Sequence, residues 1–240
     1  MSDEKHSIKG NTKEILLIPI QSIIFDMDGL LLDSERIYRT AWQKATQEQG
    51  FSLSDSGYEE MIGRSTHEGE MILAERLSSK FNVALFKNRW ETIRDTIIEK
   101  SGVPLKPGVN EILSFLEGKK IRKAIATSST RKDALKSLAG HSVLQQMDAL
   151  ITADQVQRSK PAPDLFLKAL ETLKAQALHT LVLEDSEAGV RAAQTAQIRV
   201  ILVPDLKSPQ PSIRKVAFRC FSSLFEVKEF FQSHEKILFC

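Results

Sequence analysis

The sequence predicts an α/β fold in which a parallel sheet forms the core and a block of helices is inserted into it. Three observations support this prediction. Short apolar runs with the composition of β-strands recur along the chain, helical patterns separate the later runs, and a long stretch after the first run shows helical spacing only. Strands that alternate with helices form a parallel sheet with right-handed crossovers. We therefore expect a Rossmann-like core with an inserted all-helical domain.

The expected strands are short and fall in two separate parts of the chain. Their ranges are 22–26, 122–127, 149–152, 180–184 and 200–203. Helical patterns occupy 131–139, 164–174 and 188–196, between the later strands. A strand, a helix and the next strand in this order form the crossover unit of a parallel sheet. The later strands are therefore expected to run parallel to one another.

The stretch from residue 33 to residue 103 has helical spacing throughout. Apolar residues such as Ile37, Ala41 and Ala45 recur every three or four positions, and a Gly/Pro-rich segment at 102–108 ends the stretch. The insertion could be a second lobe without a further role. It begins, however, beside the loop that follows the first strand, which favours a lid. We assign residues 34–103 to a helical cap domain, residues 15–33 and 104–240 to a discontinuous catalytic core, and residues 1–14 to a flexible tail.

Composition argues against several classes of partner. The 240 residues carry a formal net charge of +2 without a dense basic stripe, so nucleic-acid binding is not expected. The apolar run at 15–20 is short and contains Pro19, so neither a membrane span nor a signal peptide is expected. Cys220 and Cys240 cannot form a disulfide framework, which favours the cytoplasm. The Phe-rich stretch 218–239 suits an interface or a final helix packed on the core; we favour the packed helix and expect a monomer.

Two aspartates follow the first expected strand. Asp26 and Asp28 lie where the chain leaves the sheet, the edge at which open α/β sheets bind ligands. Gly29 allows an immediate turn, so both carboxylates can face one small volume and serve a divalent cation, acid–base chemistry or covalent catalysis. The pair could also be an ordinary Asp-Gly turn. A calcium loop does not fit, because its glycine belongs at the sixth position and Gly29 is the fourth.

The second expected strand leads into hydroxyl residues, Thr127 to Thr130. Hydroxyls and free backbone N–H groups between a strand and a helix can hold an oxygen of a phosphate group. Taken alone, these residues are better explained as a helix N-cap, and we expect one of residues 128 to 130 to cap the helix that follows.

Lys160 lies in a proline-rich segment and is followed by Pro161 and Pro163. A single lysine is usually a solvated surface charge. The prolines, however, stiffen this loop and limit the freedom of the side chain. A cation held near several carboxylates would offset their repulsion and stabilise charge that develops on a phosphoryl group.

Glu184 and Asp185 end the fourth expected strand, directly before a helix. Asp185 or Ser186 could cap that helix, with Glu187 complementing the helix dipole. The alternative is a further carboxylate ligand for Mg2+, an ion that prefers oxygen ligands and keeps exchangeable waters. All four motifs follow parallel strands, whose carboxyl ends share one edge of the sheet. Together they predict a metal-assisted phosphoryl-transfer site.

In this order the motifs resemble those of the haloacid dehalogenase-like superfamily. They are Asp26-Met-Asp28-Gly-Leu-Leu-Leu-Asp33-Ser34, then Thr127-Ser128, Lys160-Pro161 and Glu184-Asp185. The helical insertion is similar to the small cap of the subfamily that includes β-phosphoglucomutase and many sugar- and nucleotide-phosphate phosphatases. The first motif, extended to Glu35, is especially similar to that of pseudouridine-5′-phosphatases. The resemblance covers the chain from about Ile23 to Pro204.

The resemblance implies a role for each acid of the first motif and for the lysine. Asp26 would attack phosphorus and form an aspartyl-phosphate. Asp28 would protonate the leaving oxygen and then activate water, while its backbone carbonyl contacts Mg2+. Lys160 would bind the transferring group and keep Asp26 ionised. The presence of Asp28 argues against dehalogenation, since a departing halide needs no proton.

The resemblance also implies the remaining ligands. Thr127 and the neighbouring Ser128 would hold a phosphoryl oxygen. Asp185 would bind Mg2+, and Glu184 would bind it directly or through water. The expected enzyme is therefore a Mg2+-dependent phosphoric monoester hydrolase.

Substrate choice is expected to depend on the cap. Gly63 and Arg64 lie in the loop where related enzymes contact substrate, although Arg64 could equally be a surface residue after a helix-ending glycine. Glu35 and His67 are further candidates. The expected substrate is a small phosphorylated metabolite, a sugar or nucleoside monophosphate. The alternatives are a sugar-phosphate mutase that uses the same nucleophile and a binding protein that has lost turnover.

Overall fold

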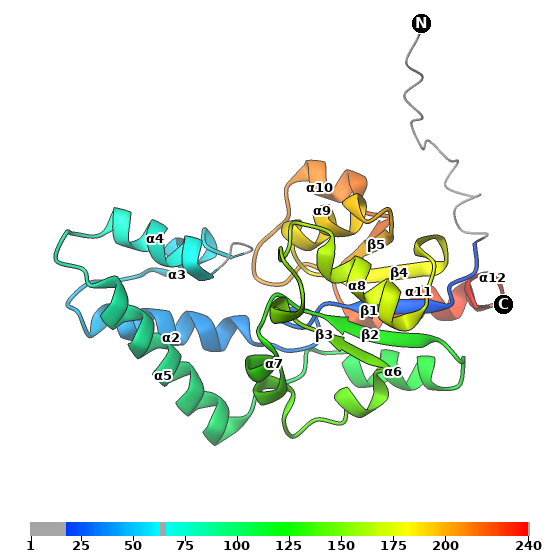
Figure 1. Ribbon diagram of the computed structural model, residues 1–240, viewed down its shortest axis with the longest axis horizontal. Helices are drawn as coiled ribbons and strands as arrows, with labels where there is room; N and C mark the ends of the chain where they lie inside the picture. Colours follow the sequence, from blue (N-terminus) through cyan, green and yellow to red (C-terminus); the bar gives the residue numbers. More distant parts are fainter. Residues whose placement is uncertain (1–17, 63–65, 240) are drawn as a thin grey trace, which may run out of the picture.

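The computed structural model describes residues 18–62 and 66–239, and its core is one parallel sheet of six strands (Figure 1). The strands lie in the order β3-β2-β1-β4-β5-β6. Their bounds are β1 (Ser22–Phe25), β2 (Arg122–Ala126), β3 (Ala149–Ile151), β4 (Thr180–Glu184), β5 (Arg199–Leu202) and β6 (Arg219–Cys220). The predicted Rossmann-like sheet and its five strands are confirmed. The sequence analysis missed β6, which is only two residues long.

Strand register brings the carboxyl ends of the central strands level with one another. Phe25 of β1 lies opposite Ile125 of β2 on one side and Leu183 of β4 on the other. The residues that follow these three positions therefore leave the sheet at the same edge. Successive β1 residues Ile23 and Ile24 contact different hydrophobic clusters, so the sheet is buried on both faces, as expected for parallel strands.

Helices cover both faces of the sheet. On one face lie α6 (Val109–Glu117), α7 (Arg131–Leu138), α11 (Leu224–Ser233) and α12 (Glu235–Leu238). On the other lie α8 (Asp164–Leu173), α9 (Glu187–Thr195) and α10 (Pro211–Val216). Single 3-10 turns occupy Leu144–Gln146, Ala153–Gln155 and Ala177–His179. Phe231 of α11 is completely buried, so the Phe-rich C-terminal stretch packs on the core as predicted.

The chain between β1 and α6 forms a helical lobe that projects from the sheet (Figure 1). Its helices are α2 (Glu35–Gln47), α3 (Asp55–Glu59), α4 (Thr66–Arg76) and α5 (Val83–Ser101), and the name helical lobe is kept for these four. They enclose an aromatic cluster of their own, in which Trp42 meets Phe86 edge-on with ring centroids 5.1 Å apart. A lobe with its own core can keep its shape while it is positioned over the sheet.

Three predictions concern other parts of the chain. The expected tail, residues 1–14, lies outside the described residues. Within the described part, each helix is too short or too polar to span a lipid bilayer. The assignment of residues 34–103 to a cap domain stays a prediction, although the helices of that stretch do form the helical lobe.

Candidate active site

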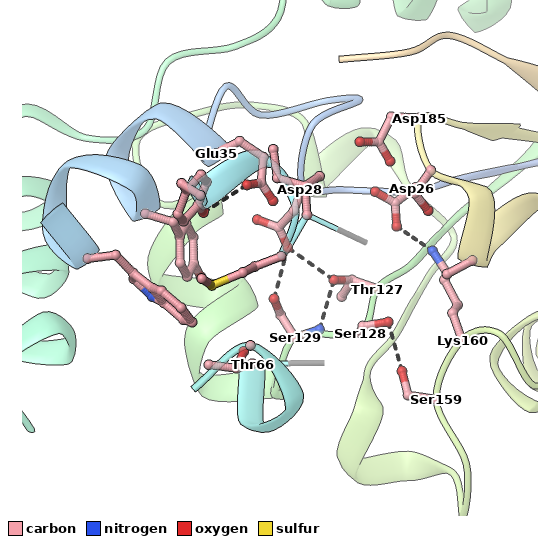
Figure 2. Close-up of a pocket in the computed structure, with 18 residues that line it drawn as sticks. Asp26, Asp28, Glu35, Thr66, Thr127, Ser128, Ser129, Ser159, Lys160 and Asp185 are labelled. Atoms are coloured by element: carbon pink, nitrogen blue, oxygen red, sulfur yellow. Dashed lines mark hydrogen bonds and ion pairs between the residues drawn. The ribbon is translucent and has the colours of Figure 1, made fainter. Parts of the chain in front are cut away.

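A pocket of about 270 Å³ lies between the carboxyl edge of the sheet and the helical lobe (Figure 2). The sheet side supplies acids, hydroxyls and a lysine, while the lobe supplies mainly aromatic and apolar side chains. The sheet-side residues lining it are Asp26, Asp28, Thr127, Ser128, Ser129, Ser159, Lys160, Asp185, Ser186 and Ala188. Residues from all four predicted motifs therefore meet in one cavity.

Lys160 is a buried cation between two carboxylates. Its Nζ forms an ion pair with Asp26, lies 2.6 Å from Glu184 Oε1 and donates to the backbone carbonyl oxygen of Ala126 at 2.9 Å. Burial alone would lower the pKa of Lys160, but the charges of Asp26 and Glu184 outweigh burial and raise it. The side chain is only 4% exposed. The alternative of a solvated surface lysine is therefore wrong.

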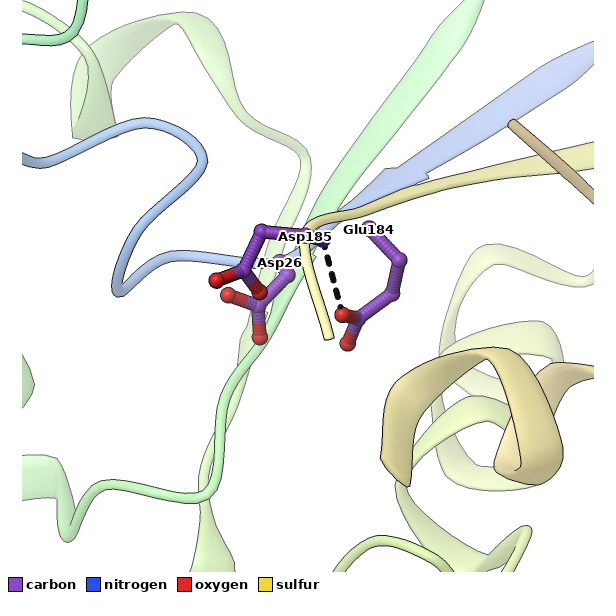
Figure 3. Close-up of side chains that lie close together, drawn as sticks. All are labelled: Asp26, Glu184 and Asp185. Carbon is purple, nitrogen blue, oxygen red and sulfur yellow. Dashed lines mark hydrogen bonds between the residues drawn. The ribbon is translucent and has the colours of Figure 1, made fainter. Parts of the chain in front are cut away.

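Three carboxylates form a set of suitable metal ligands. Oxygen atoms of Asp26, Glu184 and Asp185 all lie within 4.8 Å of one another (Figure 3). Burial, together with the charges of neighbouring acids, raises the pKa of both Asp26 and Asp185 despite the opposing effect of Lys160. These three carboxylates carry more negative charge than one lysine can balance, and such a set of oxygen ligands fits a hard divalent cation such as Mg2+.

Glu184 is fixed by the start of α9 as well as by Lys160. Its Oε2 accepts hydrogen bonds from the backbone N–H groups of Asp185 and Ser186 and from the Ser186 hydroxyl. Ser186 also caps α9, because its Oγ accepts from the N–H of Gly189 at 3.1 Å. Since Ser186 is the cap, Asp185 is left to face the other acids.

Asp28 lies in a ring of hydroxyl donors. Its Oδ1 accepts from Ser34 at 2.7 Å, and its Oδ2 accepts from Ser129 at 2.8 Å and from Thr127 at 3.3 Å. The carboxylate of Asp28 is separate from the three-acid set, which is consistent with a metal contact through its backbone rather than its side chain. Gly29 next to it has φ +86°, and a Cβ at that position would overlap the carboxylate of Asp185.

The hydroxyl loop after β2 is held from both sides. Thr127 is almost fully buried, and its Oγ1 accepts from the N–H of Ser129 at 3.0 Å. Ser128 accepts from the hydroxyl of Ser159 at 2.7 Å. Thr130 is the N-cap of α7, so Thr127, Ser128 and Ser129 face the pocket instead. Ser129 lies within the hydroxyl segment 127–130 and Ser159 directly precedes Lys160, but the sequence analysis did not single out either as a site residue.

Glu35 is the acid that the helical lobe contributes to the pocket. The hydroxyl of Tyr58 donates to its Oε2 at 3.0 Å. Burial, opposed by this hydrogen bond and assisted by the charges of Asp28 and Asp205, raises the pKa of Glu35 to about 7. A carboxyl group with this pKa can exchange its proton near neutral pH.

The rest of the lobe wall was not predicted. It consists of Tyr38, Trp42, Tyr58, Met61, Ile62, Thr66 and Gly69. Their helical spacing was interpreted only as lobe packing, and the spacing does not show which edge of the packed lobe faces the sheet. Gly63 and Arg64 lie outside the described residues. His67 is exposed and is not among the described residues that line the pocket.

The parallel sheet, its acidic edge and the buried lysine define an α/β enzyme. Comparison with known proteins gives its family: a model described as haloacid dehalogenase-like hydrolase matches residues 23–203. The chain belongs to the haloacid dehalogenase-like hydrolase family, as the four motifs indicated.

Relatives in this family are named phosphatases. The phosphorylated carbohydrates phosphatase of Thermotoga maritima is 33% identical and is matched over 76% of this chain and 84% of its own length. The (DL)-glycerol-3-phosphatase 2 of Arabidopsis thaliana is 31% identical, with 87% and 89% covered. The crystal structure of a β-phosphoglucomutase from Clostridium difficile superposes with a TM-score of 0.72. It covers 90% of this chain and 97% of its own, but at 21% identity it supports the fold alone.

Proposed function

We propose that the chain is a Mg2+-dependent phosphatase that hydrolyses a small phosphorylated metabolite through an aspartyl-phosphate on Asp26. The observation that carries this proposal is the position of Asp26, which lines the pocket, pairs with buried Lys160 and belongs to the three-acid set. Two relatives, a carbohydrate-phosphate phosphatase and a glycerol-3-phosphatase, act on small phosphate esters by name. Family membership and site chemistry therefore support the same reaction class.

In the first half-reaction, a carboxylate oxygen of Asp26 attacks phosphorus, and the bond from phosphorus to the ester oxygen of the substrate breaks. Asp28 donates its proton to that oxygen, so the alcohol leaves as a neutral molecule. In the second half-reaction, Asp28 removes a proton from water as the water attacks the aspartyl-phosphate. Inorganic phosphate leaves and the carboxylate of Asp26 is restored.

The surrounding residues hold the phosphoryl group and balance its charge. Lys160 lowers the pKa of Asp26 against the effect of burial and would neutralise phosphoryl oxygens, while Thr127 and Ser128 would bind one of those oxygens. Asp26, Asp185, Glu184 and the backbone carbonyl of Asp28 would hold Mg2+. Bound Mg2+ would supply the positive charge that offsets repulsion between the acidic site and the anionic substrate.

The lobe wall suggests how the leaving group is recognised. Tyr38, Trp42 and Met61 offer flat or apolar surface, and Glu35 offers a hydrogen-bonding group for a hydroxyl. Among the described residues that line the pocket, Lys160 is the only lysine or arginine. This wall suits an uncharged, hydroxylated leaving group such as a sugar or nucleoside. Gly63 and Arg64 are retained as proposed substrate contacts, and residues 34–103 as the proposed cap. A monomer in the cytoplasm is the expected setting.

The substitution Asp26→Asn tests the proposal. We expect Mg2+-dependent release of phosphate from p-nitrophenyl phosphate and from a panel of phosphorylated metabolites. Replacing the nucleophile should lower kcat by about 10^3-fold or more. Asp55→Asn, on the exposed start of α3, is the matched control and should keep wild-type kcat. Equal turnover by wild type and Asp26→Asn would contradict the mechanism, and a complete lack of turnover would favour the binding-protein alternative.

The mutase alternative predicts a different product. With β-glucose 1-phosphate, a phosphatase releases inorganic phosphate and glucose, whereas a mutase yields glucose 6-phosphate. A mutase must also hold a phosphate group that it does not transfer; Lys160 is the only lysine or arginine among the described residues lining the pocket, and Arg64 lies outside the described residues. Glucose 6-phosphate as the main product would establish the mutase instead.

A further inference from the structure

Asp205 is a buried acid at the same edge of the sheet, outside the four predicted motifs. It follows β5 by three residues, and its side chain is only 5% exposed. Its Oδ1 forms an ion pair with Lys106 Nζ at 2.5 Å. Its Oδ2 is buried and has no hydrogen-bond partner within the described part of the chain. An unpaired buried carboxylate oxygen is unfavourable unless another donor reaches it.

The unpaired oxygen is directed at the space beside the three-acid set. A Cβ placed on Gly29 would lie 3.4 Å from Asp205 Oδ2 and would overlap Asp185 Oδ2. Both carboxylates therefore approach the same point next to Gly29. Lys106, which also lies 3.8 Å from Asp33, holds Asp205 from the opposite oxygen. The side chain is thus fixed with one acceptor directed at the proposed ion site.

Space for water exists on this side of the site. A second cavity, of about 350 Å³, is lined by Asp185, Asp205 and Ser186 and by Lys207 and Gln210. A buried water needs such a polar, roomy environment and between two and four hydrogen-bonding partners. This cavity shares Ile62, Asp185, Ser186 and Ala188 with the substrate pocket, so the two cavities adjoin beside Asp185.

We propose that Asp205 is a positioning residue whose Oδ2 accepts a hydrogen bond from a water molecule bound to the Mg2+ ion. This inference rests on the proposed function only in requiring the ion. A group that fixes a metal-bound water raises metal affinity without contacting the metal, and losing such a partner typically lowers affinity by 10- to 100-fold. The ion pair with Lys106 fixes the orientation of the Asp205 side chain, and the unpaired Oδ2 accepts the hydrogen bond from the water.

The substitution Asp205→Asn separates this role from a purely structural one. An asparagine oxygen can still accept from Lys106, but the amide group on the other side donates where Oδ2 accepted. We expect the Mg2+ dissociation constant of the substrate-free protein, measured by titration calorimetry with MgCl2, to rise by about tenfold. The melting temperature without Mg2+ should stay close to that of wild type, because the Lys106 contact is kept.

Asp33→Asn is the matched control, since Asp33 also faces Lys106. Its Mg2+ affinity should remain within about twofold of wild type. Unchanged affinity in Asp205→Asn, or an equal loss in both variants, would overturn the role of Asp205. If the wild-type protein binds no Mg2+, the result would contradict the role of Mg2+ in the proposed function. If Asp205→Asn does not fold, Asp205→Ser is measured in the same way; failure of both to fold in saturating Mg2+ would make Asp205 a structural residue.

Discussion

Lys160 Nζ lies 2.6 Å from Glu184 Oε1 and is at the same time ion-paired with Asp26. One ammonium group therefore joins the carboxylate proposed as nucleophile to a carboxylate proposed as metal ligand. Both acids are buried, so neither can replace this contact with bulk water. Lys160 holds together two parts of the site that come from different strands, β1 and β4.

The substitution Lys160→Met should remove activity and weaken the fold. Loss of the cation leaves the buried carboxylates of Asp26 and Glu184 unpaired, which should lower the free energy of unfolding by about 3 kcal/mol. It also removes charge stabilisation at phosphorus, so kcat should fall by at least about 10^2-fold. Urea unfolding and phosphate release measure the two effects. As a control, Lys168→Met removes a lysine that is 42% exposed, and it should change neither the free energy of unfolding nor kcat.

The sequence predicted the site because its chemistry is local. Asp26 and Asp185 lie at the ends of apolar runs, Lys160 follows the third expected strand by eight residues, and parallel topology brings such strand ends to one edge. The sequence analysis missed Asp205, although this aspartate follows the expected strand 200–203 directly after Pro204. Its importance depends on an approach to Gly29, which lies far away along the chain.

The lobe wall could not be predicted for a different reason. Tyr58 reaches Glu35 across 23 positions of sequence, and the contact depends on how α2 and α3 pack together. Helical periodicity shows that a helix buries one face, but not which neighbour covers it. Substrate contacts from the lobe are therefore harder to identify from sequence than the catalytic groups at the sheet edge.

The substitution Gly189→Ala should disturb Glu184 without changing any charge. A Cβ at Gly189 would overlap the carboxyl group of Glu184, which cannot move without losing its bonds to Lys160 or to Ser186. We expect Mg2+ affinity to fall by about tenfold, as for other changes next to metal ligands. The free energy of unfolding should fall by about 1–3 kcal/mol. Calorimetry with MgCl2 and urea unfolding measure these effects.

Gly118→Ala is the control for that change. Nothing lies within 4 Å of a Cβ at Gly118, which follows α6 with φ −78°. This variant should be as stable as wild type or slightly more stable, because alanine restricts the unfolded chain. Equal Mg2+ affinity in both alanine variants would show that Glu184 tolerates displacement.

The substitution Glu35→Gln should change how stability depends on pH. The pKa of Glu35 is raised from 4.5 to about 7, chiefly by burial, so the folded protein binds this proton more tightly than the unfolded chain does. Its stabilising contribution is complete below pH 4.5 and is lost as pH rises through 7. Relative to Glu35→Gln, wild type should therefore lose up to about 3 kcal/mol between pH 4.5 and pH 8. Urea unfolding of both proteins across this range measures the difference.

The comparison with Glu35→Gln changes one side chain and keeps its neighbours Asp28, Asp205 and Tyr58. A constant difference in unfolding free energy from pH 4.5 to pH 8 would contradict the raised pKa of Glu35, because it would mean that the folded and unfolded chains bind its proton equally.

Arg94 ties the helical lobe to the core beside the hydroxyl loop. Its guanidinium lies 2.8 Å from Asp95 and 3.2 Å from Asp133, which belongs to the first turn of α7, and it stacks over the ring of Trp90. Arg94→Met should lower the free energy of unfolding by about 1–3 kcal/mol, because a mostly buried cation loses charged and aromatic partners together. As a control, Arg89→Met removes an exposed salt bridge with Glu48 and should lower the free energy of unfolding by less than about 1 kcal/mol. Equal unfolding free energies for the two variants, measured in urea at low and high salt, would show that Arg94 does not hold the lobe in place.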